Sequence, residues 1–143
     1  MSAQAESGPA CPCGRRDARD RPLAYGQCCG RYIEDFAASP APDAESLMRS
    51  RYSAFVRERA DYLLATWHRS TRPASLDFEP GVKWLGLEVR ARSAPDADRA
   101  EVEFVARQRG VSGAAVRLHE RSRFVREPDG DRLRWYYVDG DLR

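Results

Sequence analysis

Residues 114–126 read AAVRLHERSRFVR, and basic side chains occupy every second position in the middle of this stretch. Successive residues of a strand point to opposite faces of the sheet, so the side chains between the basic ones face the other way. The basic set is Arg117, His119, Arg121 and Arg123, and the opposite set is Val116, Leu118, Glu120, Ser122 and Phe124. This alternation predicts a long strand with one solvated face and one face toward the core.

Shorter runs with the same alternation lie on both sides of this stretch. We expect strands over residues 82–90, 100–108 and 132–139. Turn-forming residues separate them near Pro95, Gly110 and Gly130. Strands joined by such short connections predict an antiparallel meander, in which each strand pairs with the next one along the chain.

Before Gly81 the apolar residues recur at helical spacing instead. We expect one helix over residues 44–58, which begins after the good N-cap residue Asp43 and carries Glu45 in its first turn. A second, shorter helix is expected over residues 60–67. Helices followed by strands predict an α+β fold, with the helices packed on one face of a curved antiparallel sheet.

Charged residues interrupt the apolar faces at two places. Glu120 falls on the inward face of the central strand, and Arg51 falls on the apolar stripe of the longer helix. A buried carboxylate needs a partner, because an unpaired charge in a low dielectric costs several kcal/mol. We therefore expect Arg51 and Glu120 to lie near each other between helix and sheet, with Tyr52 beside them. The alternative is a β-bulge near Glu120 that flips the register and exposes its side chain.

The same face supplies candidates for a small-ligand pocket. They are Arg51, Tyr52, Trp84, His119, Glu120, Ser122 and Trp135. Most aromatic residues at strand spacing belong to a core, and the sequence sets no nucleophile or partner beside either histidine, so no catalytic residue is assigned. An enzyme that uses Glu120, Arg51 and a histidine as acid–base or anion-orienting groups is the alternative function.

All four cysteines fall within the segment CPCGRRDARDRPLAYGQCCG, residues 11–30. Disulfides are disfavoured in a chain without a secretory signal, and redox catalysis typically shows a Cys-x-x-Cys beside a βαβ pattern. We expect a structural site for one zinc ion, because Zn²⁺ takes four soft ligands in a tetrahedron and four thiolates leave no position for water. The expected ligands are Cys11, Cys13, Cys28 and Cys29.

The overall charge argues against nucleic acid as a partner. Lysine and arginine total 24 against 22 acidic residues, which gives a formal net charge of +2. The isoelectric point is about 8.4, whereas nucleic-acid-binding domains typically exceed about 9. The chain has no apolar stretch of about 18 residues that could span a membrane, and its first residues do not resemble a secretory signal. We therefore expect a cytoplasmic protein without a membrane or nucleic-acid partner.

Several segments resemble known families. CPCG followed by CCG resembles the SEC-C zinc motif, named for the C-terminus of the SecA translocation ATPase. The rest of the chain resembles the YchJ family of uncharacterised bacterial proteins. The segments that carry this resemblance are MRSRYSAF (48–55), YLLATWH (62–68), WLGLEV (84–89), VEFVA (102–106), LHERSRF (118–124) and WYYVDG (135–140).

The resemblance implies a SEC-C-like zinc motif at residues 11–32 and a nuclear-transport-factor-2-like α+β domain at residues 44–143. A linker at residues 33–43 joins them, and residues 1–10 are expected to be disordered. A domain of this kind is a cone with a pocket between its helices and the curved sheet. The fold hosts both enzymes and non-enzymes. On the chemistry of the site we favour a zinc-stabilised binding module, with an unknown protein partner at the zinc knob (residues 11–32) and an unknown small molecule in the pocket.

The loop between the cysteine pairs departs from the SEC-C pattern. SEC-C loops are usually shorter and contain lysines, whereas residues 14–27 contain none and retain only Tyr25. The SEC-C element of SecA engages the chaperone SecB, which makes a protein-binding role a fair analogy here. A role that depends on the missing lysines does not carry over.

Overall fold

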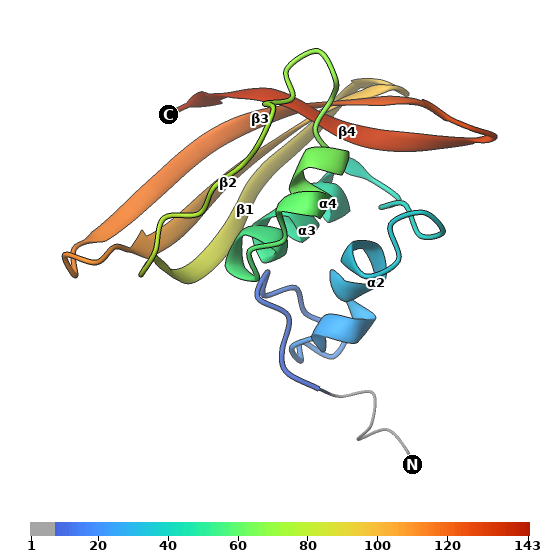
Figure 1. Cartoon of the computed structure of the whole chain (residues 1–143). Helices are drawn as coiled ribbons and strands as arrows, with labels where there is room; N and C mark the ends of the chain where they lie inside the picture. The colour runs from blue at the N-terminus through green and yellow to red at the C-terminus, as the bar shows by residue number, and fades with distance from the viewer. Residues whose placement is uncertain (1–7) are drawn as a thin grey trace.

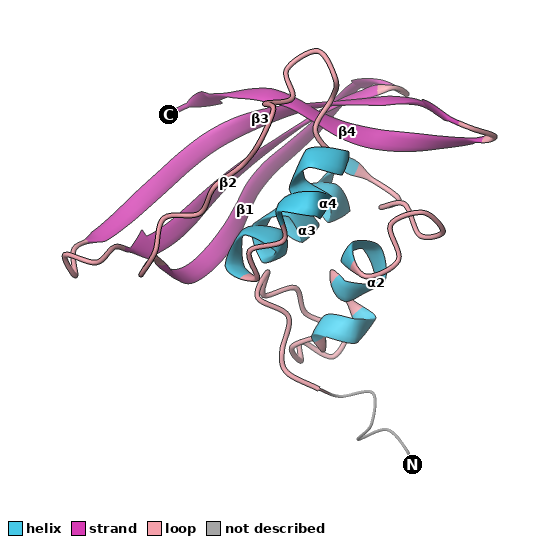
Figure 2. Cartoon of the chain, viewed as in Figure 1, coloured by secondary structure: helices cyan, strands magenta, loops and turns pink. Residues whose placement is uncertain are grey.

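The computed structural model describes residues 8–143, so most of the stretch expected to be disordered lies outside the described residues. Four helical elements precede four strands, as Figures 1 and 2 show. The helical elements are the 3₁₀ helix η1 (Tyr25–Gln27), α2 (Gly30–Ile33), α3 (Ala44–Val56) and α4 (Ala60–Ala65). The strands are β1 (Lys83–Asp96), β2 (Arg99–Arg109), β3 (Ala115–Asp129) and β4 (Arg132–Leu142).

The strands form one antiparallel sheet in the order β1-β2-β3-β4, which confirms the predicted meander. The helices cover one face of this curved sheet (Figure 2). β1 extends beyond the expected end at residue 90 because three register shifts let it bend while it stays paired with β2. Pro95 is tolerated there because β1 is an edge strand, so one side of its backbone needs no partner.

The register of β3 decides where Glu120 points. β3 pairs with β2 without a shift over its whole paired length, and Phe104 lies opposite Glu120. The irregularity lies on the other side, where Phe124 pairs with Tyr137 and Arg123 with Asp139, which leaves Val138 as an extra residue of β4. A bulge at Glu120 is therefore wrong, and the strict alternation holds.

The long helix begins where the sequence predicts. The Asp43 carboxylate accepts a hydrogen bond of 2.7 Å from the backbone N–H of Ser46, as an N-cap residue does. α3 ends at Val56, two residues before the expected end, because the chain turns at Glu58, whose φ of 56° is incompatible with a helix. None of the described helices is long and apolar enough to cross a bilayer.

A single apolar core runs from the cysteine segment to the sheet. Leu47 of α3, Leu63 of α4 and Phe124 of β3 are almost completely buried in it. Burying each such side chain contributes about 1.5–3 kcal/mol to the stability of the folded chain. α3 lies in the middle of this arrangement, with the sheet on one side and the N-terminal segment on the other (Figure 1).

Candidate metal centre and pocket

The N-terminal segment folds back on itself and brings the cysteine pairs together. The backbone N–H of Cys11 donates to the carbonyl of Leu23, and isolated bridges join Ala10 to Ala24 and Arg16 to Pro22. A turn follows the first pair at Gly14, whose φ of 76° suits glycine. The second pair lies between η1 and α2, with Cys29 as the N-cap residue of α2.

The four thiols form a compact, buried cluster. Their sulfur atoms all lie within 4.8 Å of one another, and the Sγ atoms of Cys13 and Cys28 are 3.6 Å apart. Sulfur ligands at about 2.3 Å from a tetrahedral zinc ion lie about 3.8 Å from one another. Each cysteine is at most 5% exposed. The donor set therefore fits a metal ion that prefers soft ligands.

The thiols also bias one another's ionisation. Hydrogen bonds from Cys13, Cys28 and Cys29 lower the pKa of the Cys11 thiol. Hydrogen bonding to Cys11 raises the pKa of Cys29, and burial adds to that rise. One thiolate within the cluster is thus stabilised by the remaining thiols as donors.

Helix α3 anchors this cluster through polar contacts. The guanidinium of Arg49 donates from Nη1 to the carbonyl of Cys13 at 3.0 Å and from Nε to Glu45 at 2.8 Å. The hydroxyl of Ser53, which is completely buried, lies 3.5 Å from the Sγ of Cys11. Arg15 adds a hydrogen bond of 2.9 Å to Ser46. The segment that carries the four cysteines is therefore packed against one face of α3.

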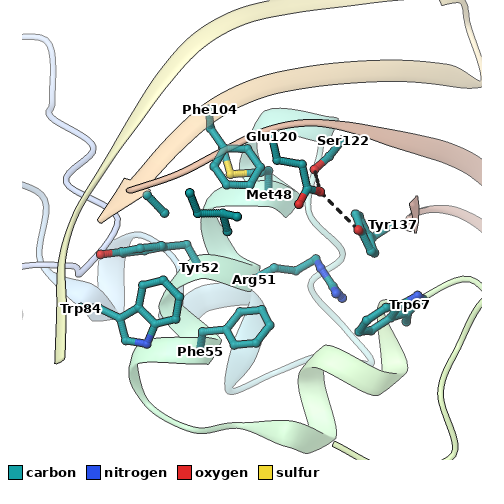
Figure 3. Close-up of a pocket in the computed structure, with 12 residues that line it drawn as sticks. Met48, Arg51, Tyr52, Phe55, Trp67, Trp84, Phe104, Glu120, Ser122 and Tyr137 are labelled. Carbon is teal, nitrogen blue, oxygen red and sulfur yellow. Dashed lines mark hydrogen bonds between the residues drawn. The ribbon is translucent and has the colours of Figure 1, made fainter. Parts of the chain in front are cut away.

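The opposite face of α3 lines a pocket of about 230 Å³ above which β2, β3 and β4 curve (Figure 3). Most of its lining is apolar or aromatic, and the exceptions are Arg51, Glu120 and Ser122. The apolar and aromatic lining residues are Met48, Tyr52, Phe55, Trp67, Trp84, Phe104, Ala106, Leu118 and Tyr137. A partly open, mostly apolar and aromatic pocket with a few polar groups is typical of a small-molecule site.

Arg51 is held deep in this pocket by the helices themselves. Its Nη1 atom donates to the carbonyl of Leu63 at 2.8 Å and to the hydroxyl of Thr66 at 2.7 Å. Its guanidinium lies over the rings of Trp67 and Tyr137, 5.0 and 4.5 Å from their centroids. Burial lowers the pKa of Arg51 to about 10, so the side chain keeps its charge at neutral pH.

Glu120 faces the same pocket from the sheet. Its Oε2 atom accepts hydrogen bonds from the Ser122 hydroxyl at 2.6 Å and the Tyr137 hydroxyl at 3.3 Å. Burial and the neighbouring carboxylate raise the pKa of Tyr137 to about 12. Arg51 and Glu120 line one cavity, yet Arg51 makes no ion pair within 4.0 Å among the described residues. They share a site without direct contact.

The structure places the other predicted pocket residues in two groups. Tyr52 and Trp84 form part of the wall, with ring centroids 5.5 Å apart. His119 lies on the outer face of the sheet, where its Nε2 is 2.7 Å from Glu103. It points away from the pocket because it follows the basic residues in the alternation of β3. Trp135 is buried further along the sheet, beside the start of α3, and does not line the pocket.

Four aromatic residues of the pocket were not among the predicted ones, namely Phe55, Trp67, Phe104 and Tyr137. Trp67 follows α4 and forms a bridge with Tyr137 of β4, and the two rings meet edge to face at 5.2 Å. The signal for Tyr137 was its spacing of two residues from Trp135, which puts both on the inner face of β4. No comparable signal existed for Trp67, because its position depends on where α4 ends.

A family model described as "YchJ, middle NTF2-like domain" matches residues 43–140. The chain belongs to the YchJ family. A UPF0225 protein of Polaromonas sp. strain JS666 is 68% identical over 143 residues, which is all of both chains. A UPF0225 protein of Bordetella pertussis is 53% identical over 144 residues and is likewise covered completely.

Two solved structures extend the likeness of this YchJ-family chain to the cysteine segment. A SEC-C motif-containing protein from Psychrobacter arcticus is 31% identical, with a TM-score of 0.78 over 97% of this chain and 85% of that one. RPA3114 of Rhodopseudomonas palustris, also described as containing a SEC-C motif, is 30% identical, with a TM-score of 0.74 over 94% and 99% of the two chains. Both likenesses therefore extend over nearly the whole of this chain.

Proposed function

We propose that this protein is a zinc-stabilised binding protein whose NTF2-like domain takes a small organic ligand. The observation that carries the proposal is the position of α3. One face of this helix anchors the four-cysteine cluster through Arg49 and Ser53. Its other face supplies Arg51 and Tyr52 to the aromatic pocket. A metal that fixes α3 would therefore also fix one wall of the pocket.

The donor chemistry supports zinc as the metal. Four buried sulfur ligands within 4.8 Å of one another suit a tetrahedral ion. Zn²⁺ held in this way crosslinks two chain segments and supplies no redox chemistry. Cys11 and Cys13 would hold it from one side, and Cys28 and Cys29 from the other. The buried surroundings favour a structural role.

Binding is better supported than catalysis. The enzyme alternative needs a histidine beside Glu120 and Arg51, and both histidines lie elsewhere. His119 contacts Glu103 on the outer face of the sheet, and His68 contacts Glu127 at 3.0 Å. A carboxylate and a guanidinium that is already held by backbone and rings can orient a ligand, but they do not form an acid–base pair.

A protein partner at the zinc knob stays a prediction, as does the cytoplasmic location. The loop between the cysteine pairs exposes arginines, which are partly offset by Asp17 and Asp20 within the same loop. This mixed charge favours a partner with both acidic and basic groups over nucleic acid.

Metal analysis tests the first half of the proposal. Protein purified without tags or chelators should contain about one zinc ion per chain, and Cys28→Ser should lose most of it. The matched control is Ser112→Ala, because Ser112 is an exposed residue outside the cluster. Zinc-free protein with four titratable thiols and an ordered N-terminal segment would contradict the assignment.

A thermal-shift screen of small organic compounds tests the second half. Compounds that bind in the pocket should raise the unfolding temperature of the wild-type protein and lose this effect in Leu118→Phe, which narrows the cavity. Val116→Phe is the matched control, because Val116 lies on the same face of β3 but is half-exposed and outside the pocket. Equal shifts in both variants would place the binding elsewhere.

A further inference from the structure

The walls of the pocket suit a flat ring. Trp84 meets Tyr52 edge to face at 5.5 Å and Phe55 in a tilted arrangement at 5.9 Å. Aromatic side chains attract further rings in such offset and edge-to-face geometries. A dry cavity of about 150 Å³ accepts benzene. The pocket of about 230 Å³ therefore has room for one or two rings.

Arg51 is already partly engaged by the protein. Its Nη1 atom donates to Leu63 and Thr66, whereas its Nε and Nη2 atoms have no acceptor among the residues that the structure describes. Its guanidinium lies over Trp67 and Tyr137 and is turned toward them in Figure 3. The protein thus uses this cation to connect α3 with the end of α4 and with β4.

Glu120 has an oxygen left for a ligand. Its Oε2 atom accepts from Ser122 and Tyr137, whereas its Oε1 atom accepts no hydrogen bond from the residues that the structure describes. Figure 3 shows this carboxylate at the rim of the ring-lined space. A carboxylate oxygen can only accept hydrogen bonds, so the ligand group that meets it must be a donor.

Arg51 and Glu120 together make the pocket unfavourable for charged ligands. A cationic ligand that entered the aromatic walls would meet the Arg51 guanidinium, which lies over the same rings. An anionic ligand would meet the Glu120 carboxylate. Because the two side chains offset each other's charge within one low-dielectric cavity, an uncharged ligand has the smallest electrostatic cost.

We infer that the pocket takes an uncharged aromatic compound of one or two rings that donates an N–H or O–H hydrogen bond to Glu120. This inference rests on the proposed ligand-binding function and adds the chemical class. Glu120 is in this view a specificity residue, and the surrounding rings supply most of the affinity.

Calorimetric titration with four probes tests the inference on the full chain with its metal. Indole has a ring N–H, 1-methylindole lacks it, benzoate is an anion and benzyltrimethylammonium is a cation. We expect indole to bind at least about tenfold more tightly than each of the other three, because a hydrogen bond to a charged acceptor is worth that much.

Variants at Glu120 assign the preference to this side chain. In Glu120→Met the ratio between indole and 1-methylindole should fall to about one, and in Glu120→Gln it should take an intermediate value. Glu103→Gln is the matched control, because Glu103 lies on the outer face of the sheet with His119 and should leave the ratio unchanged. Circular dichroism shows whether each variant is folded.

The remaining outcomes distinguish failure of the inferred ligand class from failure of the proposed pocket function. Tighter binding of benzoate or of the ammonium probe, or equal binding of the two indoles, would overturn the ligand class and leave the pocket function standing. If none of the four probes binds, the inference is wrong. If Leu118→Phe then also raises the unfolding temperature without any ligand, the cavity is a packing void and the proposed pocket function fails with it.

Discussion

At the scale of single residues, Gly140 sets the position of Glu120. A Cβ atom at Gly140 would overlap with Oε2 and Cδ of the Glu120 side chain. Gly140→Ala should therefore displace the carboxylate and break its hydrogen bonds with Ser122 and Tyr137. We expect a loss of about 1–3 kcal/mol in the free energy of unfolding, measured by urea denaturation.

A double-mutant cycle isolates this contact. Gly110→Ala is the control, because its added methyl group meets open space and should change stability by less than about 0.5 kcal/mol. Glu120→Ala combined with Gly140→Ala should cost less than the sum of the single changes, because the overlap disappears. Additive costs would show that Gly140 acts through the backbone and not through Glu120.

Tyr137 makes the free energy of unfolding depend on pH in the alkaline range. Burial and the nearby Glu120 raise its pKa to about 12, whereas an unfolded tyrosine ionises near 10. Between these values the unfolded chain loses the proton first, so stability falls as the pH rises. The slope is at most about 1 kcal/mol per pH unit, since the ring is partly solvated.

Comparison with Tyr137→Phe assigns this slope. Urea midpoints between pH 9 and pH 11 should decline less steeply in the variant. Some decline remains, because burial also raises the pKa of Tyr62 to about 12 in both proteins. Identical slopes in the two proteins would mean that Tyr137 ionises as freely in the native state as in the unfolded chain.

At the scale of elements, we expect α3 to transmit metal binding from the cysteine cluster to the pocket. Arg49 lies on the face of α3 that meets the cysteine segment and donates to the carbonyl of Cys13. Residues that support metal ligands in this way typically contribute 10–100-fold to metal affinity. Arg49→Met should therefore weaken zinc binding at least about tenfold in a competition titration with a chromogenic chelator.

The control for this prediction is another arginine, which makes no contact with the cysteine segment among the described residues. Arg90 is exposed on β1 and forms its ion pair with Glu88 there, so Arg90→Met should leave zinc affinity within about twofold. A similar loss in both variants would attribute the effect to net charge and not to the anchoring of Cys13.

The same elements show what a sequence can predict. Alternation and helical spacing predicted all four strands and both longer helices, because each of these elements buries one face. The ends of α3 and α4 and the length of β1 were missed. The first two depend on backbone conformation at residues such as Glu58, and the third depends on bulges that only the pairing with β2 reveals.

The candidate site, too, could be predicted only in part from the sequence. Four cysteines within 19 residues indicate a metal site from their spacing alone. The alternation of side chains along β3 puts Glu120 and Ser122 on the inner face of the sheet. The sequence could not show that Arg51 binds the carbonyl of Leu63 instead of Glu120. That choice depends on how α4 packs against α3, which no local pattern encodes.

At the scale of the whole molecule, one continuous core predicts one cooperative unit. Cysteine residues of the N-terminal segment, Ile33 of α2 and Leu47 of α3 belong to the same buried cluster as Phe124 of the sheet. A structural metal that binds only the folded chain adds its binding free energy to the stability of everything that unfolds with it. Removal of zinc should therefore destabilise the sheet as well as the zinc knob.

Thermal unfolding before and after chelation tests this cooperativity. All three tryptophans lie outside the metal-binding segment, so their fluorescence reports on the NTF2-like domain, whereas circular dichroism reports on the whole chain. Chelation should lower both midpoints together by roughly 10 °C or more, since a structural zinc ion contributes several kcal/mol. Added Zn²⁺ should restore the midpoints, and added Mg²⁺ should not. An unchanged fluorescence midpoint after zinc has been released would show that the metal-binding segment unfolds independently of the sheet, and α3 would then transmit nothing from the cysteines to the pocket.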